Sequence, residues 1–346
     1  MANLKAPQIV IGRYGGPEVL EIRETSVAPP ETGQVRVRVA AAGINFAEVF
    51  CRLGLYRHAP PAPFVPGFEF AGEVESVGEG VPSEWLGRPV MGVTRFGGYQ
   101  GAVVVDLERV RPLPEGWTLE EGAAFPAAAL TAAYGLLEPG RLRRGERIVI
   151  HSAAGGVGST AVQIAHAIGA EVIGTCGRDE KVSVIEKMGC RLSLNYKKGD
   201  WAEHVRQELG PVDVVFDALG GSYLRDGYRL LRPGGRLISY GLGTMTPAGS
   251  RPNYFKLAWQ YLQIPRFSVF PLISDNKQVS GFNVLLLWDR MELLGEVFDR
   301  CTEWANAGQV RPLLGSVVSY REVSDAHAAL QSGSTTGKLV LRFDHD

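Results

Sequence analysis

The sequence predicts an α/β protein with two domains, one mostly β and one built on a doubly wound parallel sheet. Up to about residue 125 the chain is rich in Gly and Pro, and its apolar residues form short or alternating runs such as 34–39 and 73–77. Such runs between turn residues predict a compact domain of antiparallel strands. From about Phe125 onward, apolar runs alternate with helix-length segments, which is typical of a parallel sheet with helical crossovers. A glycine-rich turn at residues 151–158 joins the first of these runs to a helix-like segment.

Six apolar runs in the second part of the chain predict the strands of the parallel sheet. They are residues 148–151, 171–175, 191–194, 212–217, 236–240 and 267–272. Segments such as 201–209 and 223–231 have the length and pattern of crossover helices. The run at 267–272 is expected to be an edge strand, where it would pair with its copy in a homodimer.

The C-terminal part of the chain predicts a return to the first domain. Its expected elements are a helix at 291–307, a strand at 316–320, a helix from about Glu322 and a strand at 338–343. We therefore expect a discontinuous first domain, residues 1–125 with 275–346, and a nucleotide-binding domain at 126–274.

The composition excludes several classes of function. A formal net charge of -1 in 346 residues offers no electrostatic attraction for nucleic acid or anionic lipid. No apolar run is long enough to span a bilayer, and no secretory signal is visible. The four cysteines lie far apart without a C-x-x-C pair, which suits a reducing compartment. We expect a cytoplasmic protein.

The turn at 151–158 is the strongest functional signal. It follows the apolar run 147–150 and opens a segment that places Val162, Ala165 and Ile168 on one helical face. A strand, a tight turn and a helix N-terminus present backbone N–H groups to a dinucleotide pyrophosphate. The predicted contacts are Ala154, Gly155, Gly156 and Val157, although Ala153 replaces the first glycine of the usual pattern. The alternative is a strand–helix turn that binds no ligand.

The next strand indicates which dinucleotide binds. An NAD site places an acid at the end of this strand, but here the strand 171–175 is followed by Gly177, Arg178 and Lys181. A guanidinium and an ammonium attract a 2′-phosphate, so the predicted cofactor is NADPH. A solvated helix start is the alternative for the two cations. Gly241 and Leu242 follow the strand 236–240, where the nicotinamide half would lie at the carboxyl edge of the sheet.

The chain resembles the medium-chain dehydrogenase/reductase superfamily over essentially its whole length. Zinc-dependent members carry a cysteine and a G-H-E motif in the first domain, but the corresponding residues here are Asn45 and Phe68. Because these substitutions remove two ligands and 93–105 lacks the cysteines of a structural zinc lobe, we expect no zinc. The motifs that remain are similar to the zinc-free quinone oxidoreductase branch, which includes zeta-crystallin. They are residues 43–48, 54–56, 66–69, 153–158 and 216–221.

Within that branch, residues 220–222 and the insertion-like segment 276–288 look most like the homologues of the vesicle amine transport protein. The resemblance implies a GroES-like first domain and a Rossmann second domain. Two departures are notable: Glu48 stands where an aspartate is usual, and Phe50 where some quinone reductases carry a tyrosine.

Individual side chains are candidates for roles in the cleft. Asn45 would order the nicotinamide ribose or the substrate oxygen, or would simply cap a turn. Tyr56 would donate to the developing oxyanion, or would be a half-buried aromatic residue. Thr131 would contact the nicotinamide ribose or phosphates, or satisfy its own helix. Tyr196 matches a tyrosine that the branch uses on the adenosine phosphate.

These features predict an NADPH-dependent, zinc-independent oxidoreductase that transfers hydride to quinones or activated alkenes in the interdomain cleft. Such acceptors are already electrophilic, so their reduction needs orientation and charge stabilisation more than a Lewis acid. The alternatives are a dedicated enone reductase of a biosynthetic pathway and an NADPH-binding protein with little catalysis.

Overall fold

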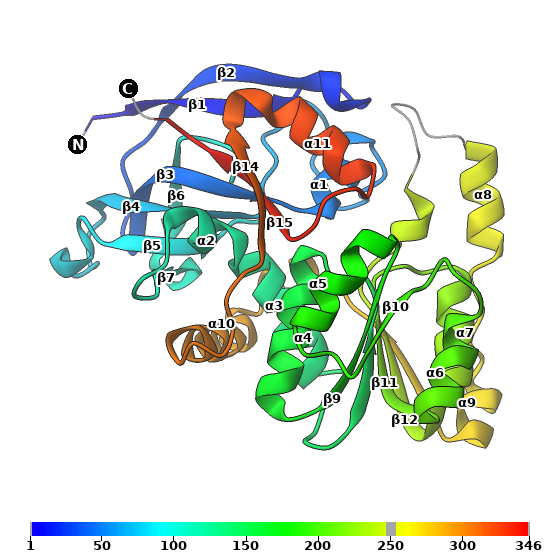
Figure 1. The fold of residues 1–346 in the computed structure, drawn as a ribbon. Coiled ribbons are helices and arrows are strands. Elements are labelled where there is room, and N and C mark those ends of the chain that lie inside the picture. Colours follow the sequence, from blue (N-terminus) through cyan, green and yellow to red (C-terminus); the bar gives the residue numbers. More distant parts are fainter. Residues whose placement is uncertain (1, 247–253, 345–346) are drawn as a thin grey trace.

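The computed structural model describes residues 2–246 and 254–344. Figure 1 shows two lobes, one mostly β and carrying both ends of the chain, the other a sheet with helices on either side. The predicted α/β class is confirmed.

The first lobe is built around a seven-stranded sheet in the order β14-β15-β3-β4-β5-β7, with β6 also paired to β3. Its strands are β3 (Gln34–Ile44), β4 (Glu69–Val77), β5 (Pro89–Val93), β6 (Ala102–Asp106), β7 (Val110–Pro112), β14 (Leu314–Ser319) and β15 (Lys338–Arg342), beside a separate antiparallel pair, β1 (Leu4–Ile11) and β2 (Leu20–Val27). Its helices are α1 (Phe46–Arg52), α2 (Leu119–Ala124) and α11 (Val323–Gln331). Because β15 pairs antiparallel with β3, the C-terminal strands return to the first lobe as the sequence predicted.

The second lobe contains a parallel six-stranded sheet in the order β10-β9-β8-β11-β12-β13. The strands are β8 (Arg147–Ile150), β9 (Glu171–Cys176), β10 (Leu192–Asn195), β11 (Val212–Asp217), β12 (Leu231–Ser239) and β13 (Gln278–Gly281). The helices of this half are α4 (Gly156–Ile168), α5 (Val182–Lys187), α6 (Trp201–Leu209), α7 (Ser222–Leu230), α8 (Tyr254–Leu262) and α9 (Val269–Asp275). This is the Rossmann order, and its switch point between β8 and β11 is where such sheets bind ligands.

One predicted strand is wrong. The sequence predicts an edge strand at 267–272, but helix α9 occupies Val269–Asp275 and the sixth strand is β13. Pro271 lies in the first turn of α9, where its missing N–H is not needed, whereas it would weaken a strand. Because β13 pairs in parallel with β12 from Arg236↔Gln278 onward, the second sheet extends past the predicted boundary at 274.

The two lobes share a hydrophobic core. Helix α3 (Pro126–Leu137) packs against α4 and against α10 (Met291–Asn306), the helix that follows β13. One buried cluster joins Ala71 and Met91 of the first lobe to Ile148 and Val162 of the second. This shared packing fixes the walls of the cleft between the lobes. In the part of the chain that the structure describes, no helix has the length and apolar character to span a bilayer.

Candidate cofactor and substrate cleft

A cavity of about 1330 Å³ lies between the two lobes. Every residue that the sequence predicted for the site lines it. They are Asn45, Tyr56, Thr131, Ala154, Gly155, Gly156, Val157, Gly177, Arg178, Lys181, Tyr196, Gly241 and Leu242. Ligand pockets of drug size have about 300–1,000 Å³, so this cavity has room for a dinucleotide and a second molecule.

The glycine turn forms one wall of the cavity. β8 ends at Ile150, and α4 begins after Gly155, which has extended backbone angles (φ -90, ψ 175). A Cβ on Gly158 would overlap the carbonyl oxygen of Ser152, so only glycine allows the turn to fold this tightly. The first N–H groups of α4 have no partner inside the helix, and this turn therefore fits a pyrophosphate.

The end of β9 carries a cluster of cations. Arg178 Nη2 donates to the carbonyl of Ser332 at 3.3 Å, and Lys181 Nζ donates to the carbonyls of Gly333 (3.0 Å) and Thr335 (2.5 Å). Asp179, one of the two acids between them, pairs with Lys198 at 2.6 Å, and the other, Glu180, makes no ion pair with either cation among the described residues. Both cations therefore face neutral oxygens of a loop from the other lobe, and their charge is available to an anion.

The tyrosine predicted for this end lies beside the cations. A Cβ on Gly177 would come within 2.6 Å of the Tyr196 hydroxyl, so the glycine allows the ring to approach the chain. Burial raises the pKa of Tyr196 to about 12. The hydroxyl therefore stays protonated and can donate to a phosphate.

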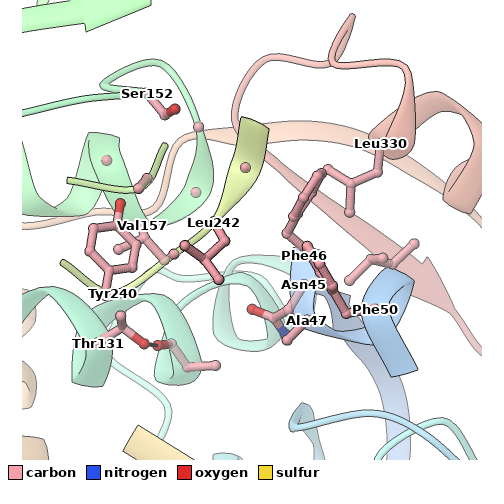
Figure 2. A pocket seen from close by; sticks show the side chains of 18 of the residues that line it. Asn45, Phe46, Ala47, Phe50, Thr131, Ser152, Val157, Tyr240, Leu242 and Leu330 are labelled. Atoms are coloured by element: carbon pink, nitrogen blue, oxygen red, sulfur yellow. Dashed lines mark hydrogen bonds between the residues drawn. The ribbon is translucent and has the colours of Figure 1, made fainter. Parts of the chain in front are cut away.

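The middle of the cleft brings residues of both lobes face to face. In Figure 2, Tyr240, Leu242 and Thr131 lie opposite Asn45 and the apolar side chains of Phe46, Ala47 and Phe50. Tyr240 stacks on Phe216 with ring centroids 4.4 Å apart. Thr131 Oγ1 donates to the carbonyl of Ala127 at 2.7 Å, so its own helix takes the hydroxyl hydrogen and leaves the oxygen as an acceptor.

Asn45 is held by three ionisable side chains. Its Nδ2 donates to Glu69 Oε1 at 2.9 Å and to Glu48 Oε1 at 3.3 Å, while its Oδ1 accepts from Lys338 Nζ at 2.5 Å. Lys338 Nζ also lies 2.5 Å from Glu69 Oε1. Because both amide hydrogens point to carboxyl groups, Asn45 has a free lone pair on Oδ1 but no free donor. This favours contact with a ribose hydroxyl over contact with a substrate oxygen.

The group Asn45, Glu48, Glu69 and Lys338 is almost completely buried. Glu48 and Glu69 have no exposed surface, and Lys338 is 5% exposed. Burial raises the pKa of Glu48 to about 8, with Lys338 opposing and Glu69 reinforcing the shift. At neutral pH Glu48 therefore holds a proton. The charges that remain in the group are the Glu69 carboxylate and the Lys338 ammonium, which balance each other. Sequence reasoning missed Lys338, because one lysine in a strand with three apolar neighbours gave no sign of a distant acid.

Tyr56 is tied to a residue that sequence reasoning also missed. Its hydroxyl accepts from Asn283 Nδ2 at 3.0 Å and lies 3.2 Å from Asn283 Oδ1, to which it can donate. Burial raises the pKa of Tyr56 to about 12. Asn283 caps the 3-10 helix η6 (Val284–Leu287), which forms part of the cavity wall. The insertion-like segment noticed in the sequence thus lines the cleft.

Comparisons with known proteins agree with this architecture. Two family models match the chain, an alcohol dehydrogenase GroES-like domain over residues 31–115 and a zinc-binding dehydrogenase over residues 156–299. The synaptic vesicle membrane protein VAT-1 homolog of Danio rerio is 34% identical over 336 residues, which cover 96% of this chain and 69% of that protein.

Two solved structures are also similar over nearly the whole chain. Quinone oxidoreductase from Thermus thermophilus, solved also in complex with NADPH, is 30% identical with a TM-score of 0.79, covering 97% of this chain and 100% of that one. CurK enoyl reductase is 27% identical with a TM-score of 0.83, covering 98% and 99% of the two chains.

The residues of the cleft do not fit the zinc that the second family description implies. Asn45 donates its amide to two carboxyl groups, and Phe68 packs its ring against Phe96 and Tyr56. Across residues 2–246 and 254–344, no three His, Cys, Asp or Glu side chains are grouped so that they could hold a metal ion. The description therefore applies to the fold of this chain rather than to a metal site.

Proposed function

The chain belongs to the quinone oxidoreductase branch of the medium-chain dehydrogenase/reductase superfamily, close to the VAT-1 homologues, and on that premise we propose that it is an NADPH-dependent, zinc-independent reductase of quinones or activated alkenes. The observation that carries the proposal is the pair Arg178 and Lys181 at the end of β9, which donate to carbonyl oxygens and form no ion pair among the described residues. A 2′-phosphate is the anion that this position would meet in a Rossmann domain.

Each wall of the cleft would hold one part of the cofactor. Gly155 to Val157 would bind the pyrophosphate through backbone N–H groups. The 2′-phosphate would be bound by the side chains of Arg178, Lys181 and Tyr196. Gly241 and Leu242 would lie against the nicotinamide, with Asn45 Oδ1 and Thr131 Oγ1 accepting from its ribose hydroxyls. NADPH, when bound, supplies a hydride; the remaining chemistry of the site is orientation and charge stabilisation by the protein.

The same residues favour acceptors that are already electrophilic. As hydride reaches a quinone or an enone, negative charge gathers on the substrate oxygen. The Tyr56 hydroxyl, a donor with a pKa of about 12, would stabilise that oxygen after exchanging its bond to Asn283. An isolated ketone would need stronger polarisation, and in the zinc-dependent relatives two of the metal ligands stand where this chain has Asn45 and Phe68.

We also propose a homodimer, formed through helices α8 and α9 instead of the edge strand that the sequence predicted at 267–272. β13 is the outer strand of the six-stranded sheet, and the two helices before it carry large apolar side chains that are mostly exposed. These are Phe255, Trp259, Tyr261, Leu262, Val269, Phe270 and Ile273. Large apolar side chains this exposed on two consecutive helices favour an interface there. Sedimentation analysis should give a dimer for the wild type and a monomer for Phe270→Glu; a monomeric wild type would contradict the proposal.

The four free cysteines support the predicted cytoplasmic location.

Two other functions use the same fold. A dedicated enone reductase of a biosynthetic pathway is supported by the similarity to CurK enoyl reductase. An NADPH-binding protein with little catalysis is the third candidate. A screen of NADPH oxidation against 1,2-quinones, 1,4-quinones, enals and enones separates the three. We expect turnover with quinones or with several enones; tight NADPH binding without turnover of any acceptor would support the third candidate and contradict our proposal.

A further inference from the structure

The charged residues of the cavity wall are all cationic. The described residues that line it include Arg109, Arg178, Lys181, Lys197 and Lys338, and no Asp or Glu. The phosphates of the proposed cofactor account for the three cations near β9. Lys338 is paired with Glu69 at 2.5 Å. Arg109 is the lining cation that neither the cofactor nor a buried acid explains.

Arg109 is held firmly in place, and its charge is only weakly balanced. It ends the 3-10 helix η3 (Leu107–Arg109) and is 7% exposed. Its guanidinium lies 4.0 Å from the centre of the Trp288 ring, and Nη1 donates to the Trp288 carbonyl at 3.1 Å and contacts the sulfur of Met291. The nearest acid, Glu108, is 3.7 Å from Nη2 and its side chain is 57% exposed. A solvated carboxylate at that distance contributes little.

One edge of the guanidinium is left without a hydrogen bond. Nε is buried and has no partner among the described residues, and Nη2 makes only the long contact with Glu108. Because Nε has almost no accessible surface, Nη2 is the nitrogen of this edge that a ligand can reach. A carboxylate oxygen that accepts from Nη2 would make a charge-assisted hydrogen bond, which is stronger than a bond between neutral groups.

The rest of the wall near Arg109 is apolar. Trp288 and Met291 touch the guanidinium, and Leu285, Leu294 and Phe298 from η6 and α10 line the same cavity. Such a wall fits an extended hydrocarbon. It also strengthens the attraction between the guanidinium and an anion, because water screens the pair poorly there.

We propose that the substrate of this cleft is an enone or quinone with an apolar body and a terminal carboxylate, and that the Arg109 guanidinium binds that carboxylate. This inference rests on the proposed reductase function. One guanidinium balances a monoanionic carboxylate, whereas a phosphate monoester would leave a second charge buried without a partner.

The test uses straight-chain methyl enones that carry a carboxylate at the far end, together with their methyl esters, over a series of chain lengths. For the best length, we expect the wild type to show a KM about tenfold lower for the acid than for the ester, as a charge-assisted hydrogen bond would give. Arg109→Met should abolish this difference while leaving the ester kinetics within about twofold. Arg109→Lys, which keeps the charge, should retain part of the preference.

A neighbouring arginine supplies the matched control. Arg111 pairs with Asp299 at 2.6 Å and does not line the cleft, so Arg111→Met should leave the acid preference unchanged. Equal KM values for acid and ester in the wild type, at every length, would overturn the proposal. So would an Arg109→Met variant that loses both substrates equally, because Arg109 would then be a structural residue.

A binding measurement keeps the inference testable if no acceptor is reduced. The NADPH-loaded protein would be titrated calorimetrically with the saturated keto acid and with its methyl ester. Tighter binding of the acid in the wild type, lost in Arg109→Met, would support the carboxylate site even though the reductase proposal had failed. Equal binding of the two compounds would overturn it.

Discussion

The glycine turn between β8 and α4 and the charged group around Asn45 line the same cleft, but they are assembled in different ways. The turn comes from one continuous stretch and offers backbone N–H groups, so it tolerates Ala153 in place of a glycine. The charged group joins Glu48 of α1, Glu69 of β4 and Lys338 of β15, which are far apart in the sequence. A site made of backbone groups depends only on the local conformation of the chain. A site made of buried ionisable side chains loses its charge balance when any one of those side chains is replaced.

The largest expected effect is on the charged group. Lys338→Met leaves the fully buried Glu69 without its cation, and breaking a buried ion pair costs about 3–5 kcal/mol. We expect a loss of this size in the free energy of unfolding, measured with denaturant. Lys198→Met is the control, because the pair Lys198–Asp179 is exposed and should change stability by less than about 1 kcal/mol. Equal effects of the two substitutions would contradict the account of the buried group.

A smaller effect is expected from the glycine turn. In Gly158→Ala the new Cβ overlaps the Ser152 carbonyl, so the backbone must shift, at a cost of about 1–3 kcal/mol. Because the shift moves the N–H groups that would hold the pyrophosphate, NADPH affinity should fall together with stability. Gly145→Ala is the control, because Gly145 has a positive φ but has nothing within 4 Å of the new Cβ. This substitution should lower stability without lowering NADPH affinity. A Gly158→Ala variant that binds NADPH normally would contradict the proposed turn.

The protonation of Glu48 gives a pH-dependent prediction. Burial raises its pKa from 4.5 to about 8, so between these values the folded protein binds a proton that the unfolded chain does not. The contribution of Glu48 to stability therefore falls as pH rises through this window, by at most about 1.4 kcal/mol per unit, and levels off above about pH 8. Denaturant unfolding at several pH values should show the stability of the wild type falling relative to Glu48→Gln. A difference that is constant from pH 5 to pH 8 would show that Glu48 is already ionised.

The comparison also explains what the sequence could predict. The strand–turn–helix at 147–168 and the cations after β9 are local, and both were predicted with their neighbours in order. The contacts Lys338–Asn45, Lys338–Glu69 and Tyr56–Asn283 join residues more than 200 positions apart, and no local pattern marks them. The prediction of a strand at 267–272 was wrong because its short apolar run fits the periodicity of a helix as well as that of a strand. Pro271 is accommodated in the first turn of the helix that forms there.

The central claim, that this cleft selects NADPH through Arg178 and Lys181, is tested most directly by the dissociation constants of NADPH and NADH in the wild type and in Arg178→Ala/Lys181→Ala. Two charge-assisted contacts predict that the wild type prefers NADPH by about 10- to 100-fold or more. The double variant should lose most of that preference by weakening NADPH binding, while NADH binding stays within about threefold. Equal affinity of the wild type for the two dinucleotides, or an equal loss of both in the variant, would contradict the claim.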